Sequence, residues 1–296
     1  MKSSILITLL TIFVLIPGIV MANVTKTEFD VKKWGDSIIK ERADKNEYFK
    51  TSPVSPMAGL LRETIESNEK LFVFMAGENI KISTKHVASP MLTILKTGSD
   101  WISIDNTGKE IIRNKSRETF LTDRFTFMCY PSEDKFTLII FDPERKMITH
   151  FKHLLYYKPD NNFRVHAKLE KYKTTKERVV KTSRDLEKTL IEYGKVKFKI
   201  NGKELSLTTF KFTSDKNDPN YKYLFLPFFD KTNLIDTYEA GRFLEVIEQE
   251  GDELIIDFNE CYNPLCNYAI VYNCTLPPFE NELDIEIKAG EKTYPH

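Results

Sequence analysis

The sequence contains little cysteine and carries no net charge. Its four cysteines are too few to form a disulfide scaffold for a chain of 296 residues, so apolar packing must supply the core. Lysine plus arginine and aspartate plus glutamate are equal at 43 each, which gives no reason to expect nucleic-acid binding. Even the most basic window, residues 164–188, is interspersed with acids and is typical of a solvated, salt-bridged surface.

The sequence also lacks the common catalytic and cofactor motifs. It has no G-x-S-x-G nucleophile elbow, no P-loop and no dinucleotide fingerprint, so no cofactor is expected. His150 and His153 have a spacing that would suit two metal ligands on a helix. Their flanks instead favour a strand, in which positions three apart face opposite sides. We therefore expect no metal site.

No apolar stretch beyond residue 22 is long enough to cross a membrane, whereas residues 1–22 have the pattern of a secretory signal peptide. Lys2 precedes an apolar run over residues 5–20, and Val20 and Ala22 stand at the −3 and −1 positions of a cleavage site. The pattern predicts cleavage after Ala22 and a periplasmic or secreted location. An uncleaved N-terminal anchor is the alternative.

The next segment, residues 23–56, is predicted to be helical. Residues 30–50 have apolar side chains at helical spacing, with Asp30 as a plausible N-cap, and Pro53 and Pro56 end the helix. Residues 57–68 are compatible with a second short helix. From Leu71 onward the pattern changes to short alternating strands separated by polar turns.

The strand spacing of roughly ten residues predicts a mainly β (α+β) domain over residues 57–296, with sandwich- or barrel-like antiparallel sheets and an N-terminal helix. It forms either one unit or two subdomains that meet near residue 190. Residues 147–151 are among the predicted strands. Asn201-Gly202 predicts a type I′ hairpin between residues 195–200 and 204–212. A second hairpin is predicted between residues 242–247 and 253–258.

Chemically distinctive residues are densest between Asp230 and Lys292. From Asp257 the chain reads DFNECYNPLCNY, followed by CTLPPFENEL and AGEK, and upstream it reads TYEAGRFL. This pattern resembles the DUF1684 family of bacterial and archaeal proteins, although Cys261 and Leu265 depart from it. The resemblance extends to residues 151–172 and to the N-terminal helix, through Trp34, Arg42, Lys45, Phe49 and Ser55-Pro56. The family has no established biochemical function, so the resemblance implies no activity.

Cys266 and Cys274 are eight positions apart within this stretch. As a disulfide they would close a short loop and contribute on the order of 2–3 kcal/mol. Two buried thiols are an alternative, since unpaired cysteines behave as small apolar residues. Metal ligation is a third interpretation, but the stretch has no C-x-x-C and no histidine. A Cys261–Cys266 pair also remains open.

The second predicted hairpin would bring Arg242 close to Asp257, which permits a bidentate ion pair. One interpretation is an internal pair that fixes the hairpin and the loop after it. The other is a pocket for a polar or anionic small molecule, to which Glu291 adds a second carboxylate. The candidate ligand-binding residues are Tyr238, Arg242, Asp257, Asn259, Tyr262, Asn263 and Glu291.

Three functional hypotheses follow. The first is an exported, periplasmic protein that binds a polar or anionic small molecule through the C-terminal motif. The second is a hydrolase or lyase with Asp257 or Glu291 as acid or base and Arg242 as anion clamp. The third is a purely structural module in which the motif is an internal lock. The sequence leaves open whether the protein is an enzyme and what its oligomeric state is.

Overall fold

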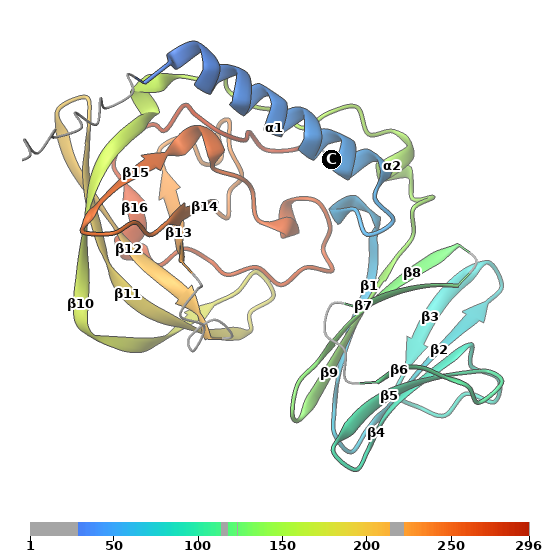
Figure 1. Ribbon diagram of the computed structural model, residues 1–296. Helices are drawn as coiled ribbons and strands as arrows, with labels where there is room; N and C mark the ends of the chain where they lie inside the picture. The colour runs from blue at the N-terminus through green and yellow to red at the C-terminus, as the bar shows by residue number, and fades with distance from the viewer. Residues whose placement is uncertain (1–28, 114–117, 123, 214–221, 296) are drawn as a thin grey trace, which may run out of the picture.

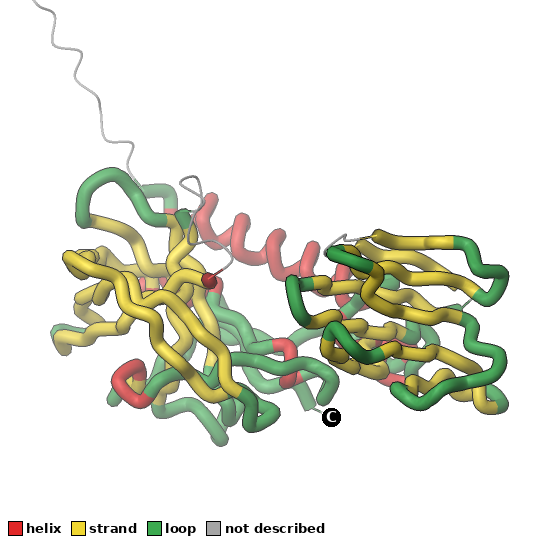
Figure 2. The backbone as a smooth tube through the Cα atoms, turned by 90° about the horizontal axis from the view of Figure 1, so that it is seen from below, coloured by secondary structure: helices red, strands yellow, loops and turns green. Residues whose placement is uncertain are grey.

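The computed structural model describes residues 29–113, 118–122, 124–213 and 222–295. The predicted signal peptide, residues 1–22, lies outside these ranges. Two β units lie side by side, and one long helix lies along them (Figure 2). The predicted class, mainly β with an N-terminal helix, is confirmed, and the molecule contains both a sandwich and a half-barrel.

Helix α1 (Val31–Thr51) confirms the predicted N-terminal helix. The Asp30 carboxylate accepts a hydrogen bond from the Lys33 backbone N–H at 3.0 Å, as an N-cap does. A 3-10 turn, η1 (Pro56–Ala58), leads directly into a strand. The predicted short helix over residues 57–68 is therefore wrong. Residues 59–66 form a strand and not a helix, because pairing with β9 (Lys135–Phe141) buries Ile65 completely.

The N-terminal β unit is a sandwich. One sheet has the order β1-β9-β8-β7 and the other β3-β2-β4-β5-β6, and both bury side chains in one shared core. The strands are β1 (Gly59–Glu66), β2 (Lys70–Ala76), β3 (Asn79–Ser83), β4 (Leu92–Thr97), β5 (Asp100–Asp105), β6 (Glu110–Arg113), β7 (Glu118–Thr122), β8 (Phe125–Pro131) and β9 (Lys135–Phe141). Trp101 and Phe136, both buried, pack against each other across this core.

The C-terminal β unit is a half-barrel built on one antiparallel sheet in the order β14-β13-β12-β11-β10-β15 (Figure 1). Its strands are β10 (Arg164–Lys181), β11 (Glu187–Ile200), β12 (Lys203–Phe212), β13 (Tyr223–Asp230), β14 (Arg242–Ile247), β15 (Glu253–Asp257) and β16 (Glu282–Leu283), the last parallel to β13. The predicted hairpin at Asn201-Gly202 is confirmed, and both turn residues have positive φ. The core of the half-barrel continues into the C-terminal segment through Phe258, Ile287 and Ala289.

The second predicted hairpin is wrong. Strands β14 and β15 are consecutive in the chain but stand at opposite ends of the sheet, since β14 pairs with β13 and β15 pairs with β10. The turn at residues 248–252 reverses the chain without pairing these strands. Pairing β15 with β10 buries Leu254 and Ile256 in the half-barrel core, which a two-stranded ribbon would not do.

The two units meet through a shared apolar cluster. Ile139 and Phe141 of the sandwich pack there with Leu190 and Phe225 of the half-barrel. The predicted meeting point near residue 190 falls inside β11, and the chain passes from one unit to the other between residues 142 and 163. Residues 147–151 are not the predicted strand: a single helical turn, α2 (Lys146–Thr149), occupies most of this segment. Within the described ranges, no helix has the length and apolar character needed to span a membrane.

Candidate functional site

Arg242 is the most deeply buried charge of the predicted site. Its guanidinium Nη2 lies 2.6 Å from Asp230 Oδ2, and both side chains are 0% exposed. The guanidinium also donates to the backbone carbonyls of Ile287 and Ala289. The predicted pair with Asp257 is wrong, because the hairpin that would have brought the two residues together does not form. Arg242 instead joins the C-terminal segment to the start of β14.

Asp257 ends β15 and anchors α1. It accepts hydrogen bonds from Trp34 Nε1 at 2.6 Å, from the Asn259 backbone N–H at 2.9 Å and from Asn259 Nδ2 at 2.8 Å. The Asn259 side chain also bonds the backbone of Asp160 as donor and acceptor. Both predicted site residues are therefore buried and engaged with protein groups.

Glu291 lies buried under α1. Its carboxylate accepts from Lys45 Nζ, from Tyr268 Oη at 2.7 Å and from the Asn263 backbone N–H at 2.8 Å. The Asn263 side chain in turn donates to the Lys292 carbonyl at 2.8 Å. Burial and the nearby Glu291 carboxylate raise the pKa of Tyr268, so this phenol remains a hydrogen-bond donor.

Helix α1 therefore holds the C-terminal motif with three side chains. Trp34 binds Asp257, and Lys45 binds Glu291. Between them Arg42 donates to the carbonyls of Tyr157 and Asn259 at 2.7 and 3.0 Å. Residues 34, 38, 42, 45 and 49 follow helical spacing and lie on one face. Sequence reasoning missed these contacts, although the same helix residues carried part of the family resemblance.

The two remaining predicted residues, Tyr238 and Tyr262, have different surroundings. Tyr238 Oη donates to Cys266 Sγ at 3.6 Å, and Tyr262 Oη donates to Glu245 at 2.7 Å. The seven predicted residues thus do not line one open pocket, although Asn259, Tyr262 and Glu291 border the same small cavity. A small cavity of about 110 Å³ remains under α1, bounded by Arg42, Lys45, Tyr156, Glu260, Tyr262 and Glu291 among others.

Glu260, which sequence reasoning missed, is an exposed residue whose carboxyl group borders this small cavity. Desolvation, with smaller effects from the carboxylates of Asp257 and Glu41, raises its pKa to about 7. A cavity of this size has room for a few water molecules. It does not have room for most metabolites, which occupy pockets of several hundred Å³.

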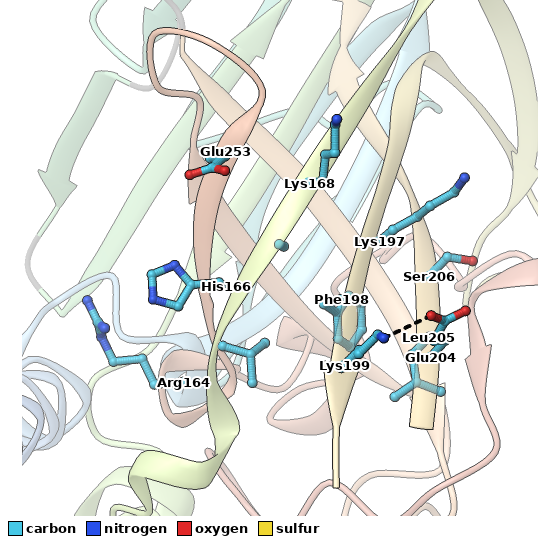
Figure 3. Close-up of a pocket in the computed structure, with 12 residues that line it drawn as sticks. Arg164, His166, Lys168, Lys197, Phe198, Lys199, Glu204, Leu205, Ser206 and Glu253 are labelled. Carbon is cyan, nitrogen blue, oxygen red and sulfur yellow. Dashed lines mark ion pairs between the residues drawn. The ribbon is translucent and has the colours of Figure 1, made fainter. Parts of the chain in front are cut away.

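A much larger pocket, of about 850 Å³, lies where β10 and β11 diverge. Their pairing begins at Ala167–Phe198, and residues 164–166 of β10 pair only with β15. In Figure 3, Arg164 and His166 lie on the β10 side of the opening, and Lys199 and Glu204 lie on the opposite side. None of the predicted site residues lines this pocket. The sequence did contain one signal for this pocket. Its β10 wall, residues 164–168, is the start of the most basic window of the sequence, residues 164–188.

The pocket combines apolar and charged side chains. The apolar lining is Val165, Ala167, Phe198 and Leu205, which belong to the half-barrel core or pack against it. The titratable lining is Arg164, His166, Lys168, Lys197, Lys199, Glu204 and Glu253. Basic groups therefore outnumber acids around an apolar wall. An amphipathic ligand with an acidic group matches this lining.

Cys261, Cys266 and Cys274 are not joined to one another by a disulfide in the structure. The disulfide predicted between Cys266 and Cys274 is not formed, although the Cys266 backbone N–H donates to Cys274 Sγ at 3.2 Å. Cys261 is buried beside Ala289, and burial raises its pKa to about 11. No group of three or more His, Cys, Asp or Glu side chains in the described ranges has an arrangement that would hold a metal ion.

These features define a mainly β protein whose N-terminal helix is fastened to a C-terminal signature. Residues 149–292 match the family described as protein of unknown function, DUF1684. The chain belongs to this family, and the resemblance read from the sequence is confirmed. The matched range begins after the sandwich, so α1 and β1–β9 lie outside it.

A solution NMR structure of an uncharacterised protein from Haloarcula marismortui is similar to this chain. The two are 32% identical over 49% of this chain and 78% of the other, with a TM-score of 0.42. No curated protein matches the chain.

Proposed function

We propose that this chain is an exported binding module for a small anionic molecule with an apolar part, and that the ligand occupies the β10–β11 pocket. The observation that carries the proposal is the pocket's volume of about 850 Å³. This volume lies within the range of small-molecule sites, whereas the cavity at the C-terminal motif, about 110 Å³, lies below it.

The charges around the pocket support an anionic ligand. Lys197 and Lys199 are more than half exposed, and their ion pairs with Glu170 and Glu204 span 2.8 and 3.0 Å. Exposed pairs of this kind contribute about 0–1 kcal/mol, so a ligand carboxylate or phosphate can displace them at little cost. The lysines are thus available to an anion, while Val165 and Leu205 offer apolar contact.

The C-terminal motif, in this proposal, is an internal lock. Arg242, Asp257, Asn259, Asn263 and Glu291 are all buried, and each bonds protein groups. This arrangement argues against the hydrolase or lyase hypothesis, since neither Asp257 nor Glu291 faces the large pocket. A ligand at the motif would have to break hydrogen bonds that these groups already make within the protein.

The ligand proposal is tested by calorimetric titration of the mature protein with three probes. Octanoate has both an alkyl chain and a negatively charged carboxylate. Octanol has only the alkyl chain, and acetate has only the carboxylate. We expect octanoate to bind most tightly, because the pocket offers both kinds of contact. The double variant Lys197→Glu/Lys199→Glu should weaken octanoate binding by about tenfold or more, which corresponds to roughly 1.4 kcal/mol. Leu205→Asp should weaken it by removing apolar contact.

A matched control keeps the charge change but moves it to the sandwich. Lys81→Glu/Lys135→Glu should leave octanoate affinity unchanged, since neither lysine lines the pocket. Equal weakening by both double variants would mean only a general electrostatic effect. Unchanged affinity in both the pocket variant and Leu205→Asp would place any binding elsewhere and overturn the proposal.

Export is the second part of the proposal and rests on residues 1–22. Expression of the full chain in a Gram-negative host, followed by intact-mass measurement of the periplasmic fraction, tests it. We expect a product that begins at Asn23. Retention of the full-length chain in the cytoplasm would contradict the assignment.

A further inference from the structure

Two cysteines of the C-terminal segment, Cys266 and Cys274, are joined by a hydrogen bond from the backbone of one to the sulfur of the other. Cys266 is on the 3-10 turn η5 (Leu265–Asn267), and its backbone N–H donates to Cys274 Sγ at 3.2 Å. Cys274 is held from the other side, because its backbone N–H donates to Ser183 Oγ at 3.0 Å and its carbonyl accepts from the Ser183 N–H at 2.8 Å. The β10–β11 turn therefore fixes the position of one thiol beside the other.

The surroundings distinguish the two thiols. Cys274 is buried, whereas Cys266 is partly exposed. A hydrogen bond from the Cys274 thiol lowers the pKa of Cys266 to about 6, against the opposing effect of burial, and the Tyr238 and Ser183 hydroxyls act in the same direction. The pKa of Cys274 is raised, first by its hydrogen bond to Cys266 and then by burial. Of the two thiols, Cys266 is thus the more accessible and the more readily ionised.

We propose that Cys266 and Cys274 form a thiol–disulfide exchange site, with Cys266 as the nucleophile and Cys274 as the resolving thiol. The site is independent of the β10–β11 pocket. It also differs from the other cysteines, because Cys129 and Cys261 are buried in the two β cores. The substrate class is an accessible disulfide, either of a small molecule or of another exported protein.

The exchange needs no other oxidant. The Cys266 thiolate attacks one sulfur of the substrate disulfide, forms a mixed disulfide and expels the other sulfur as a thiolate. Cys274 loses its proton to that thiolate or to water, and its sulfur attacks Cys266 Sγ. The mixed disulfide breaks, the second substrate thiol leaves, and a Cys266–Cys274 disulfide forms. Two electrons pass from the pair to the substrate, which is reduced to two thiols.

The test follows the release of coloured thiolate from a chromogenic aromatic disulfide, using the reduced, folded protein at pH 7. Wild type should release two equivalents per chain and finish with an internal disulfide. Cys274→Ser should release one equivalent and keep the aromatic adduct on Cys266. Cys266→Ser should react roughly a hundredfold more slowly, because the thiol that remains is buried and protonated. Cys129→Ala and Cys261→Ala should match wild type.

The internal disulfide can be located because Tyr268 and Tyr272 lie between the two cysteines. Chymotrypsin cleaves after them, so the Cys266 and Cys274 peptides remain joined only if the bond has formed. Tyr238 acts as a positioning residue for the thiolate, and Tyr238→Phe should move the midpoint of the pH–rate profile above that of wild type, with the second equivalent still released. Reaction of Cys266→Ser at the wild-type rate would overturn the proposal. A persistent adduct on wild type would overturn the resolving role of Cys274.

Discussion

Lys45 on α1 forms an ion pair with Glu291, a residue 246 positions further along the chain. The Glu291 side chain is 1% exposed, so its hydrogen-bond partners are groups inside the protein. The pair joins the N-terminal helix to the last turn of the C-terminal segment. Together with Trp34–Asp257, it makes α1 part of the half-barrel's structure.

Replacing Lys45 by methionine should destabilise the fold by about 2–3 kcal/mol, because the buried Glu291 carboxylate loses its charged donor. Urea denaturation monitored by tryptophan fluorescence measures this change. The matched control is Lys40→Met, which breaks an exposed pair with Asp44 on the same helix and should cost less than about 1 kcal/mol. Equal effects of the two variants would contradict the role given to α1.

Arg242→Met should be among the most destabilising single changes, at about 3–5 kcal/mol, since it leaves the buried Asp230 carboxylate without its partner. The double variant Arg242→Met/Asp230→Asn should recover part of this loss, because the unpaired charge is removed. Chemical denaturation of the four proteins in this cycle measures the coupling. A fully stable Arg242→Met variant that no longer binds ligand would instead support a binding site at the motif.

Gly290 cannot accept a side chain without rearrangement. Its φ is +74°, and an added Cβ would overlap Cys261 Sγ and lie 2.6 Å from the Cys261 carbonyl oxygen. Gly290→Ala should therefore cost more than about 2 kcal/mol in the free energy of unfolding. Gly77→Ala is the control, because it has a similar φ of +63° with open space around it and should cost about 1–2 kcal/mol. Thermal denaturation that ranks the two variants in the opposite order would refute the steric argument.

Glu260 should make stability depend on pH in the neutral range. Its folded-state pKa, about 7, lies above the ordinary value of 4.5, so the folded state binds more protons than the unfolded state between these values. Its contribution is therefore present at low pH and is lost as the pH rises through 7. Glu260→Gln should flatten the stability profile between pH 5 and 8, and denaturation midpoints across that range measure it. An unchanged profile would mean that the carboxyl group is not desolvated.

The sequence predicted local structure well wherever one short signal decides it. Asp30 capped the predicted helix, and Asn201-Gly202 formed the predicted turn, because both act through neighbouring backbone groups. Strand partners were harder to predict. The turn near Gly251 reverses the chain as expected, but β15 pairs with β10 because that register buries Leu254 and Ile256.

The same error explains the candidate site. Arg242 and Asp257 were placed together by a hairpin that does not form, and their actual partners are Asp230 and Trp34. Asp230 lies only twelve positions before Arg242, at the end of β13. The large pocket was not predicted. The basic window that starts at residue 164 marks its β10 wall, but no local pattern marks the point where β10 and β11 separate.

The most direct test of the account is an NMR titration of isotope-labelled protein, residues 23–296, with octanoate, which follows backbone amides residue by residue. The account predicts saturable shifts in residues 164–168, 197–199 and 204–206, which line the β10–β11 pocket. Amides of residues 261–263 and 291 should remain unchanged, since they belong to the internal lock and do not pair with the pocket strands. Shifts concentrated at those motif residues, with none along β10 and β11, would contradict it.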